Sequence, residues 1–303
     1  MDERAQVPFS PLTAGVTLAY TVGASLAWYA LRKAGYDFGK TEMVAALYWV
    51  GAAVFFGALW VARGVAPWRL TRATVVVTVS MLVFLSVFWL YGRPGSYHLF
   101  FGERPPPGGL PGLYAFFFFV GASVLCRIVL PIATGRLALG WRPRDFGYQV
   151  KGAFRLWWIY LILTAIVVPA VAYASTLPVF LRKYPWCKGA LIDGTIQGEV
   201  FLLYAASMVL FYASGEAFWR GWLLLGTEKQ LGRNALFLML MPYVLGHLGK
   251  PLAETLGAVA AGLVLGGLAL YHRSFWLGAL CHWSVAMTMD LFALWRRGVT
   301  WVW

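Results

Sequence analysis

The chain has little charge and little cysteine. Only 12% of its 303 residues are Asp, Glu, Lys or Arg, whereas soluble domains carry about 25%. Its three cysteines, Cys126, Cys187 and Cys281, form no CxxC spacing, which excludes a disulfide framework and a thiolate metal site. The sequence contains no HExxH, so the helix typical of zinc metalloproteases is excluded as well.

Long basic runs with interleaved aromatic residues are also absent, although the formal net charge is +13. The Arg and Lys residues are spread over nearly every loop. This distribution indicates contacts with anionic membrane lipids and predicts no nucleic-acid partner. Loops on the two sides of a membrane would carry nearly equal numbers of Arg and Lys residues in either orientation of the chain. The positive-inside rule therefore does not fix the orientation.

The chain is rich in long apolar segments. Of its residues, 60% are hydrophobic, and several apolar runs exceed the ~18–20 residues that cross a bilayer. The sequence predicts an all-α, polytopic transmembrane helical bundle of about eight or nine spans, an integral multi-pass protein of the cell membrane. The seventh span is short and bounded by Lys250-Pro251, so it is interpreted as a half-depth helix. The expected spans run over Leu12–Leu31, Met43–Val61, Ala73–Tyr91, Leu110–Ile132, Phe154–Ala174, Val200–Leu225, Leu236–Gly249, Pro251–Tyr271 and Phe275–Trp295.

Polar residues at membrane depth divide the chain into two predicted parts. Residues 1–198 form N-terminal spans and loops with almost no such residues, Arg127 being the main exception. Residues 199–303 contain every group that suggests chemistry and form the predicted membrane core.

Glu216 and Arg220 are the first candidates, because a charged side chain at the centre of a membrane helix costs roughly 2.5–3.5 kcal/mol on insertion scales. Their i, i+4 spacing places them on one helix face, where they can pair. The pair is either a structural ion pair or a carboxylate that a guanidinium holds ready to act as a general base.

His247 and His282 also fall in apolar segments, and imidazole is the side chain best suited to proton transfer near neutral pH. Each alone is typical of a hydrogen-bonded core residue. With Glu216 they could activate water and donate hydrogen bonds to an oxyanion, or bind zinc as two His and one carboxylate. Glu254 and Asp290 are secondary candidates. Helix capping explains Glu254, which follows Pro251 in a first helical turn.

The order Glu-x-x-x-Arg-Gly, then aromatic-x-x-x-His, then a His on the final span resembles the CAAX protease and bacteriocin-processing family, the intramembrane glutamic proteases also called the Abi family. The resemblance covers about Val200 to Trp295. The family's usual motifs are Glu-Glu-x-x-x-Arg, Phe-x-x-x-His and His-x-x-x-Asn. The matching positions here are Glu216 and Arg220 for the second Glu and the Arg, Tyr243 in place of the Phe, and His247 and His282 for the two His. Tyr243 is thereby a further secondary candidate.

Two positions depart from the family pattern. Gly215 stands where the family has its first Glu, the water-activating base, and Ala286 stands where it has the Asn of the oxyanion site. Glu216 must therefore take over the role of base. Neighbouring residues of a helix differ by about 100° of rotation, so this change requires a local adjustment, which a bulge or kink near Gly215 could supply.

The resemblance implies a hydrolase, an intramembrane endopeptidase that cleaves a membrane-anchored or C-terminal hydrophobic peptide near the membrane surface without a cofactor. Glu216, oriented by Arg220, would activate water, and His247 and His282 would hold it or stabilise the oxyanion. The main alternative is a non-catalytic relative that binds a hydrophobic or lipidated partner, such as an immunity or scaffold protein, which the missing Glu and Asn favour. A proton-coupled transporter ranks below both, because no paired inverted repeat is evident.

Overall fold

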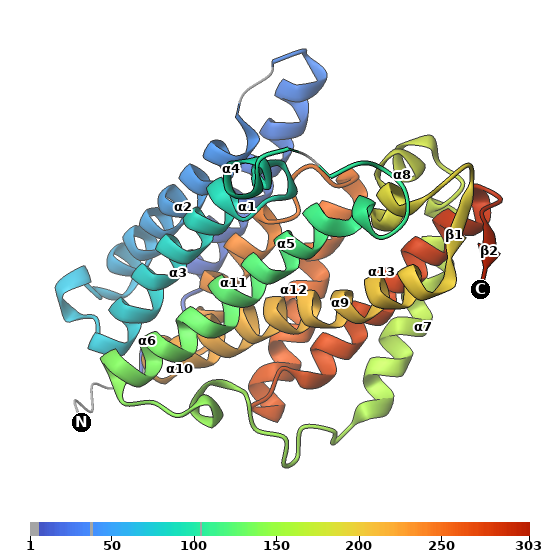
Figure 1. The fold of residues 1–303 in the computed structure, drawn as a ribbon. Coiled ribbons are helices and arrows are strands. Elements are labelled where there is room, and N and C mark those ends of the chain that lie inside the picture. The colour runs from blue at the N-terminus through green and yellow to red at the C-terminus, as the bar shows by residue number, and fades with distance from the viewer. Residues whose placement is uncertain (1–5, 37–38, 104) are drawn as a thin grey trace. The chain divides into compact units, whose positions relative to one another are not determined.

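The computed structural model describes residues 6–36, 39–103 and 105–303, and it is almost entirely helical (Figure 1). In the described residues, eight helical segments are long and apolar enough to cross a membrane. The predicted all-α, polytopic bundle is thereby confirmed, and the chain is an integral multi-pass membrane protein.

The structure agrees with the lower of the two predicted span numbers. The expected span Val200–Leu225 and the first ten residues of the expected span Leu236–Gly249 fall within one continuous candidate segment, Gly198–Leu245. The second part of this segment is helix α11, Ala235–Leu245, whose 11 residues extend only about 16 Å at about 1.5 Å per residue. This length is well below the ~30 Å of a hydrocarbon core, in agreement with a half-depth helix.

The chain forms two compact units, each built from separated segments. The first unit comprises Met1–Leu90, Cys126–Ala153 and Ala217–Phe275, and the second comprises Tyr91–Leu125, Phe154–Glu216 and Trp276–Trp303. The predicted division at residue 198 is of another kind, because it separates the part of the sequence with few polar residues at membrane depth from the part that contains the candidate site residues. This division stays a prediction.

The first unit surrounds α11 with longer helices. Nearly all of α11 is buried, and it contacts α1, α2, α12 and the π-helical stretch η7. A helix that is apolar on every side is typical of such a central position. The helices of this unit are α1 (Pro11–Lys33), α2 (Lys40–Arg63), α3 (Arg72–Tyr91), α6 (Leu130–Leu139), α10 (Gly226–Leu231), α11 and α12 (Leu252–His272), with the shorter η1 (Pro67–Arg69), η4 (Leu125–Val129), η5 (Pro143–Phe146), η7 (Ala217–Leu225) and η8 (Gly232–Asn234).

Polar contacts fix the ends and the neighbours of these helices. Ser10 caps α1 by accepting a hydrogen bond from the Thr13 backbone N–H at 3.1 Å. The indole of Trp89 on α3 donates to the Tyr48 hydroxyl on α2 at 2.7 Å. In a bilayer such buried polar groups require partners within the protein, so these contacts help to fix which helices are neighbours.

In the second unit, α9 contacts α5 and α13, and α13 also contacts α7 (Figure 1). The outer surface of α7 is apolar and exposed at Leu161, Ile162 and Ile166, as expected for a helix that faces lipid. The elements of this unit are α4 (His98–Phe101), α5 (Tyr114–Val124), α7 (Trp157–Ala174), α8 (Pro178–Lys183), α9 (Gly198–Glu216) and α13 (Trp276–Arg296), the short η2 (Pro94–Ser96), η3 (Pro111–Leu113) and η6 (Trp186–Ala190), and the strands β1 (Thr195–Gln197) and β2 (Thr300–Val302).

The two strands pair in parallel, with Thr195 opposite Thr300. Their hydroxyl oxygens lie 2.9 Å apart. This pairing joins the chain after α13 to the start of α9, the two helices that carry His282 and Glu216.

Candidate active site

A carboxylate and an imidazole meet inside the second unit. Glu216 is the last residue of α9, and its Oε1 lies 2.9 Å from Nδ1 of His282 on α13. The Glu216 side chain is fully buried, whereas that of His282 is 21% exposed. When Nδ1 carries the proton, it donates to the carboxylate, and Nε2 is the remaining polar atom of the ring. The predicted association of these two residues, far apart in the sequence, is thus present as a direct contact.

Two further residues shape this contact. The ring of Tyr212, one turn before Glu216, lies 4.5 Å from the His282 ring between centroids. Gly278, one turn before His282, has no side chain, and a Cβ there would lie 3.0 Å from Oε2 of Glu216. The small size of Gly278 therefore allows α13 to approach the carboxylate.

Where Glu216 has its predicted role as base, Gly278→Ala is expected to reduce cleavage by about tenfold to 10²-fold, because displacing a catalytic group by a fraction of an ångström to an ångström has effects of this size. The added methyl group would push the carboxylate away from its 2.9 Å contact with His282. The measurement is the initial rate of substrate cleavage. Gly121→Ala is the matched control, since a Cβ at Gly121, in the same unit, meets nothing within 4 Å. Equal rates for the two variants would contradict this account of Gly278.

The helix that carries Glu216 changes its winding directly after this residue. Residues Ala217–Leu225, η7, are π-helical. A π-helical turn contains an extra residue and therefore shifts the following side chains around the axis, and such turns are frequent at functional sites. An irregular winding that could supply the expected local adjustment near Gly215 therefore begins two residues after it.

In the first unit, Arg220, Tyr243 and His247 form a second group. The guanidinium of Arg220 on η7 is 1% exposed, and its Cζ lies 4.2 Å from the centroid of the Tyr243 ring on α11. The Tyr243 ring lies 4.8 Å from that of His247, whose Nδ1 is 2.8 Å from the Tyr243 carbonyl oxygen. Tyr243 thus presents its aromatic face to Arg220, and an aromatic face attracts a desolvated guanidinium.

The glycines of the GxxxG sequence in α12 allow α11 to pack closely. A Cβ at Gly262 would lie 2.3 Å from Leu240 and 3.0 Å from Tyr243, and one at Gly266 would lie 2.4 Å from Leu236. The close approach that small residues permit in membrane helices places the Tyr243 ring against α12.

The turn after His247 is held by hydroxyl groups. Thr255 on α12 donates to the His247 carbonyl oxygen at 2.9 Å, and the hydroxyl of Tyr29 on α1 lies 2.8 Å from that of Thr255. Glu254, a secondary candidate, lies in the first turn of α12 with its Oε1 2.7 Å from Nζ of Lys250. This contact and the position of Glu254 agree with a structural role at the helix start.

Asp290, the other secondary candidate, lies further along α13 and is 1% exposed. Its carboxylate accepts hydrogen bonds from the Tyr204 hydroxyl and, at 3.0 Å, from the Trp186 backbone N–H. Asp290 therefore attaches the connector that contains Trp186 to the membrane helices. Burial and the nearby Asp290 carboxylate raise the pKa of the Cys187 thiol in that connector, which keeps this thiol protonated.

Asp290→Asn is expected to lower the free energy of unfolding by about 1.5–3 kcal/mol, the usual contribution of a hydrogen bond to a charged group. The amide retains one acceptor oxygen and loses the second. The measurement is unfolding by denaturant or heat in a fixed detergent. Asp193→Asn, at an exposed loop position, is the control and should change the stability by no more than about 0.5 kcal/mol. A similar stability of both variants would show that Asp290 does not hold the connector.

Within each unit, the described residues contain no group of three or more His, Cys, Asp or Glu that could hold a metal ion. The second unit brings Glu216 and His282 together, and the first brings Arg220, Tyr243 and His247 together. The predicted pairing of Glu216 with Arg220 joins residues of different units and stays a prediction.

Residues 197–288 match the model of a protease family, the Rce1-like type II CAAX prenyl endopeptidases. The match covers less than half of the chain, so it shows a similarity to this family; residues 197–288 are called the Rce1-like segment. Its bounds are close to those of the predicted resemblance, Val200–Trp295, which is thereby confirmed. No curated protein and no solved structure matches the chain.

The Rce1-like segment contains Glu216, Arg220, His247 and His282, whereas Asp290 lies beyond its end. Sequence reasoning missed Tyr212 and Gly278. The only signal available for them was their spacing of four residues from Glu216 and from His282, which places each pair on one helix face.

Proposed function

We propose that this protein is an intramembrane endopeptidase that hydrolyses a peptide bond near the membrane surface, in a membrane-anchored or C-terminal hydrophobic substrate. The 2.9 Å contact between Glu216 and His282 within the Rce1-like segment carries this proposal. A carboxylate and an imidazole in direct contact can move a proton between water, substrate and protein, which peptide hydrolysis requires.

In the proposed reaction, Glu216 acts as the general base for a water molecule. The water proton passes to the carboxylate as the water oxygen bonds to the substrate carbonyl carbon, and negative charge develops on the carbonyl oxygen. His282 or His247, carrying a proton on Nε2 as well as on the Nδ1 that donates to Glu216 or to the Tyr243 carbonyl oxygen, stabilises this oxyanion through its Nε2–H. The proton is then delivered to the amide nitrogen, the C–N bond breaks, and a carboxylate and an amine leave.

Arg220 and Thr255 orient the segments that carry the reacting side chains. Arg220, held over the Tyr243 ring, supplies a fixed positive charge to the helical segment that follows Glu216. The hydrogen bond from Thr255 to the His247 carbonyl oxygen holds the turn in which His247 lies. This scheme uses no cofactor. Zinc held by Glu216, His247 and His282 is the alternative, and it predicts loss of activity with a chelator and recovery with added zinc.

The test is cleavage of a library of membrane-anchored peptides, with and without a C-terminal prenyl group, by the full chain in lipid nanodiscs. The proposal predicts a discrete pair of products for at least one substrate class, in the presence of a chelator. Absence of products from every class, with folding verified by a cooperative thermal transition, would contradict it.

A second candidate function is the binding of a hydrophobic or lipidated partner without cleavage. For either function, the cell membrane is the location that we propose. Gly215 and Ala286, which replace the family's first Glu and its Asn, favour this candidate. It predicts saturable binding of a hydrophobic or lipidated peptide that is recovered intact. It also predicts equal binding by the wild type and by Glu216→Gln, because binding alone does not require a base.

A further inference from the structure

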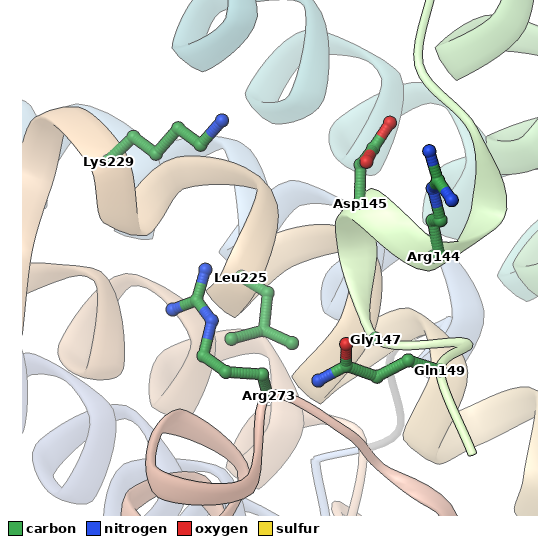
Figure 2. A pocket seen from close by; sticks show the side chains of 7 residues that line it. All are labelled: Arg144, Asp145, Gly147, Gln149, Leu225, Lys229 and Arg273. Carbon is green, nitrogen blue, oxygen red and sulfur yellow. The ribbon is translucent and has the colours of Figure 1, made fainter. Parts of the chain in front are cut away.

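A polar cavity of about 230 Å³ lies entirely within the first unit, and none of the residues of the proposed reaction lines it (Figure 2). Its walls come from η5 and the connector after it, the end of η7, α10 and the residue that follows α12. The lining residues are Arg144, Asp145, Gly147, Gln149, Leu225, Lys229 and Arg273.

The charge around this cavity is mainly positive. Arg144, Lys229 and Arg273 line it, and Asp145 is the one acidic residue among the lining groups. In Figure 2, Lys229 and Arg273 lie on one side and Arg144 and Asp145 on the other. Asp145 accepts a hydrogen bond at 2.7 Å from the backbone N–H of Arg142, and the Arg273 Nη1 lies 3.0 Å from Glu228 Oε2. Both carboxylates are therefore engaged, and the cations outnumber them.

Hydrogen bonds hold the walls in place. The Gln149 side-chain amide donates to the His272 carbonyl oxygen at 3.2 Å, and the Ser274 hydroxyl donates to the Gln149 carbonyl oxygen at 3.0 Å. Gly147 has φ of 97°, and a Cβ there would lie 3.1 Å from Leu225 and 3.2 Å from Phe275. The connector is thus fixed to the end of α12 before any ligand binds, which lowers the entropy cost of binding.

The positions of two lining residues at the ends of candidate spans indicate that the cavity is near a membrane surface. Arg273 directly follows the candidate span Leu252–His272, and Arg144 lies in the connector after the candidate span Pro111–Leu139. Residues at the ends of spans lie in the headgroup region, where lipid phosphates are the principal anions. The volume is below the ~300–1,000 Å³ of pockets for drug-sized ligands, so it suits a small group.

We propose that this cavity binds a phosphate group, presented by an anionic lipid headgroup or by a soluble phosphate. Guanidinium groups match phosphate oxygens with two parallel hydrogen bonds, and Lys229 adds a mobile point charge. Leu225 contributes an apolar side chain to the lining. This proposal does not depend on the proposed peptidase function.

The test measures binding to the full chain in phosphatidylcholine nanodiscs. In one arm, phosphatidylglycerol is added to the bilayer, and bound lipid is counted by native mass spectrometry. In the other arm, inorganic phosphate is titrated, and the thermal unfolding midpoint is followed by Trp fluorescence, since a ligand of the native state raises it. Binding in the first arm alone identifies a lipid headgroup, and binding in the second identifies a soluble phosphate.

Arg144→Gln and Lys229→Gln should each weaken binding about tenfold, the effect of losing one charge-assisted contact. Asp145→Asn should tighten binding several-fold, because it removes the acidic lining residue and retains an acceptor for the Arg142 N–H; damage to the fold cannot produce this result. Arg136→Gln, at an exposed position outside the cavity, is the control and should bind as the wild type does. No binding in either arm, or equal affinities for the cavity variants and this control, would overturn the proposal.

Discussion

Glu216→Gln should lower the rate of peptide hydrolysis by about 10²–10⁴-fold, the range that a positioned general base contributes. Glutamine has nearly the same size and shape as glutamate, and its amide can still form a hydrogen bond with His282 Nδ1, so the packing between α9 and α13 is retained. It cannot accept the proton of the attacking water. The measurement is the initial rate of cleavage in nanodiscs under conditions where the substrate is saturating.

Glu199→Gln is the matched control. This residue has the same chemistry and lies in the first turn of the same helix, α9, but it is exposed. The control should keep the wild-type rate. If Glu216→Gln also kept that rate, Glu216 would not be the base, and the assignment of the role to the surviving carboxylate would be wrong.

His282→Ala should reduce both activity and stability. It removes the partner of a fully buried carboxylate, and leaving a buried charge without its partner typically costs about 3–5 kcal/mol. The rate of cleavage should fall by about 10²–10⁴-fold, because the imidazole that transfers a proton or stabilises the oxyanion is absent. Thermal unfolding and initial rates, measured on the same preparation, give the two effects separately.

His282→Asn separates catalysis from folding. Its amide N–H can replace the Nδ1 donor toward Glu216 and should recover most of the lost stability. Asparagine does not titrate near neutral pH, so the rate should stay low. His98→Ala, in an exposed part of the chain, should change neither quantity. Recovery of the rate together with the stability would show that His282 serves only to hold Glu216.

Composition and the order of polar residues predicted the class of fold and the region of the site. Long apolar runs are sufficient to predict spans, because the bilayer leaves few alternatives to helices. Inserting a carboxylate or a histidine into an apolar segment costs free energy unless the group has a partner. The presence of both types in such segments therefore indicated that they meet, as Glu216 and His282 do.

Other features depended on packing that no local pattern encodes. The length of η7 follows from how the helix fits its neighbours, so the sequence indicated an irregularity near Gly215 without its extent. Gly278 is one of many glycines, and only the approach of α13 to Oε2 of Glu216 distinguishes it. The cavity brings together Arg144, Lys229 and Arg273 from three segments that are separated in the sequence, and no local pattern of the sequence relates these three residues.

The central claim is that this protein hydrolyses a peptide bond with water activated by Glu216. The most direct measurement is cleavage in ¹⁸O-labelled water, followed by mass spectrometry of the products. The wild-type chain is expected to form a new C-terminal carboxylate with one ¹⁸O atom. The cleavage rates of Glu216→Gln and of the double variant Glu216→Gln/His282→Ala should be reduced to a similar extent, because the effects of mutating residues that act as a unit are not additive. Recovery of every substrate intact after incubation with the wild type, or full ¹⁸O incorporation by Glu216→Gln, would contradict the central claim.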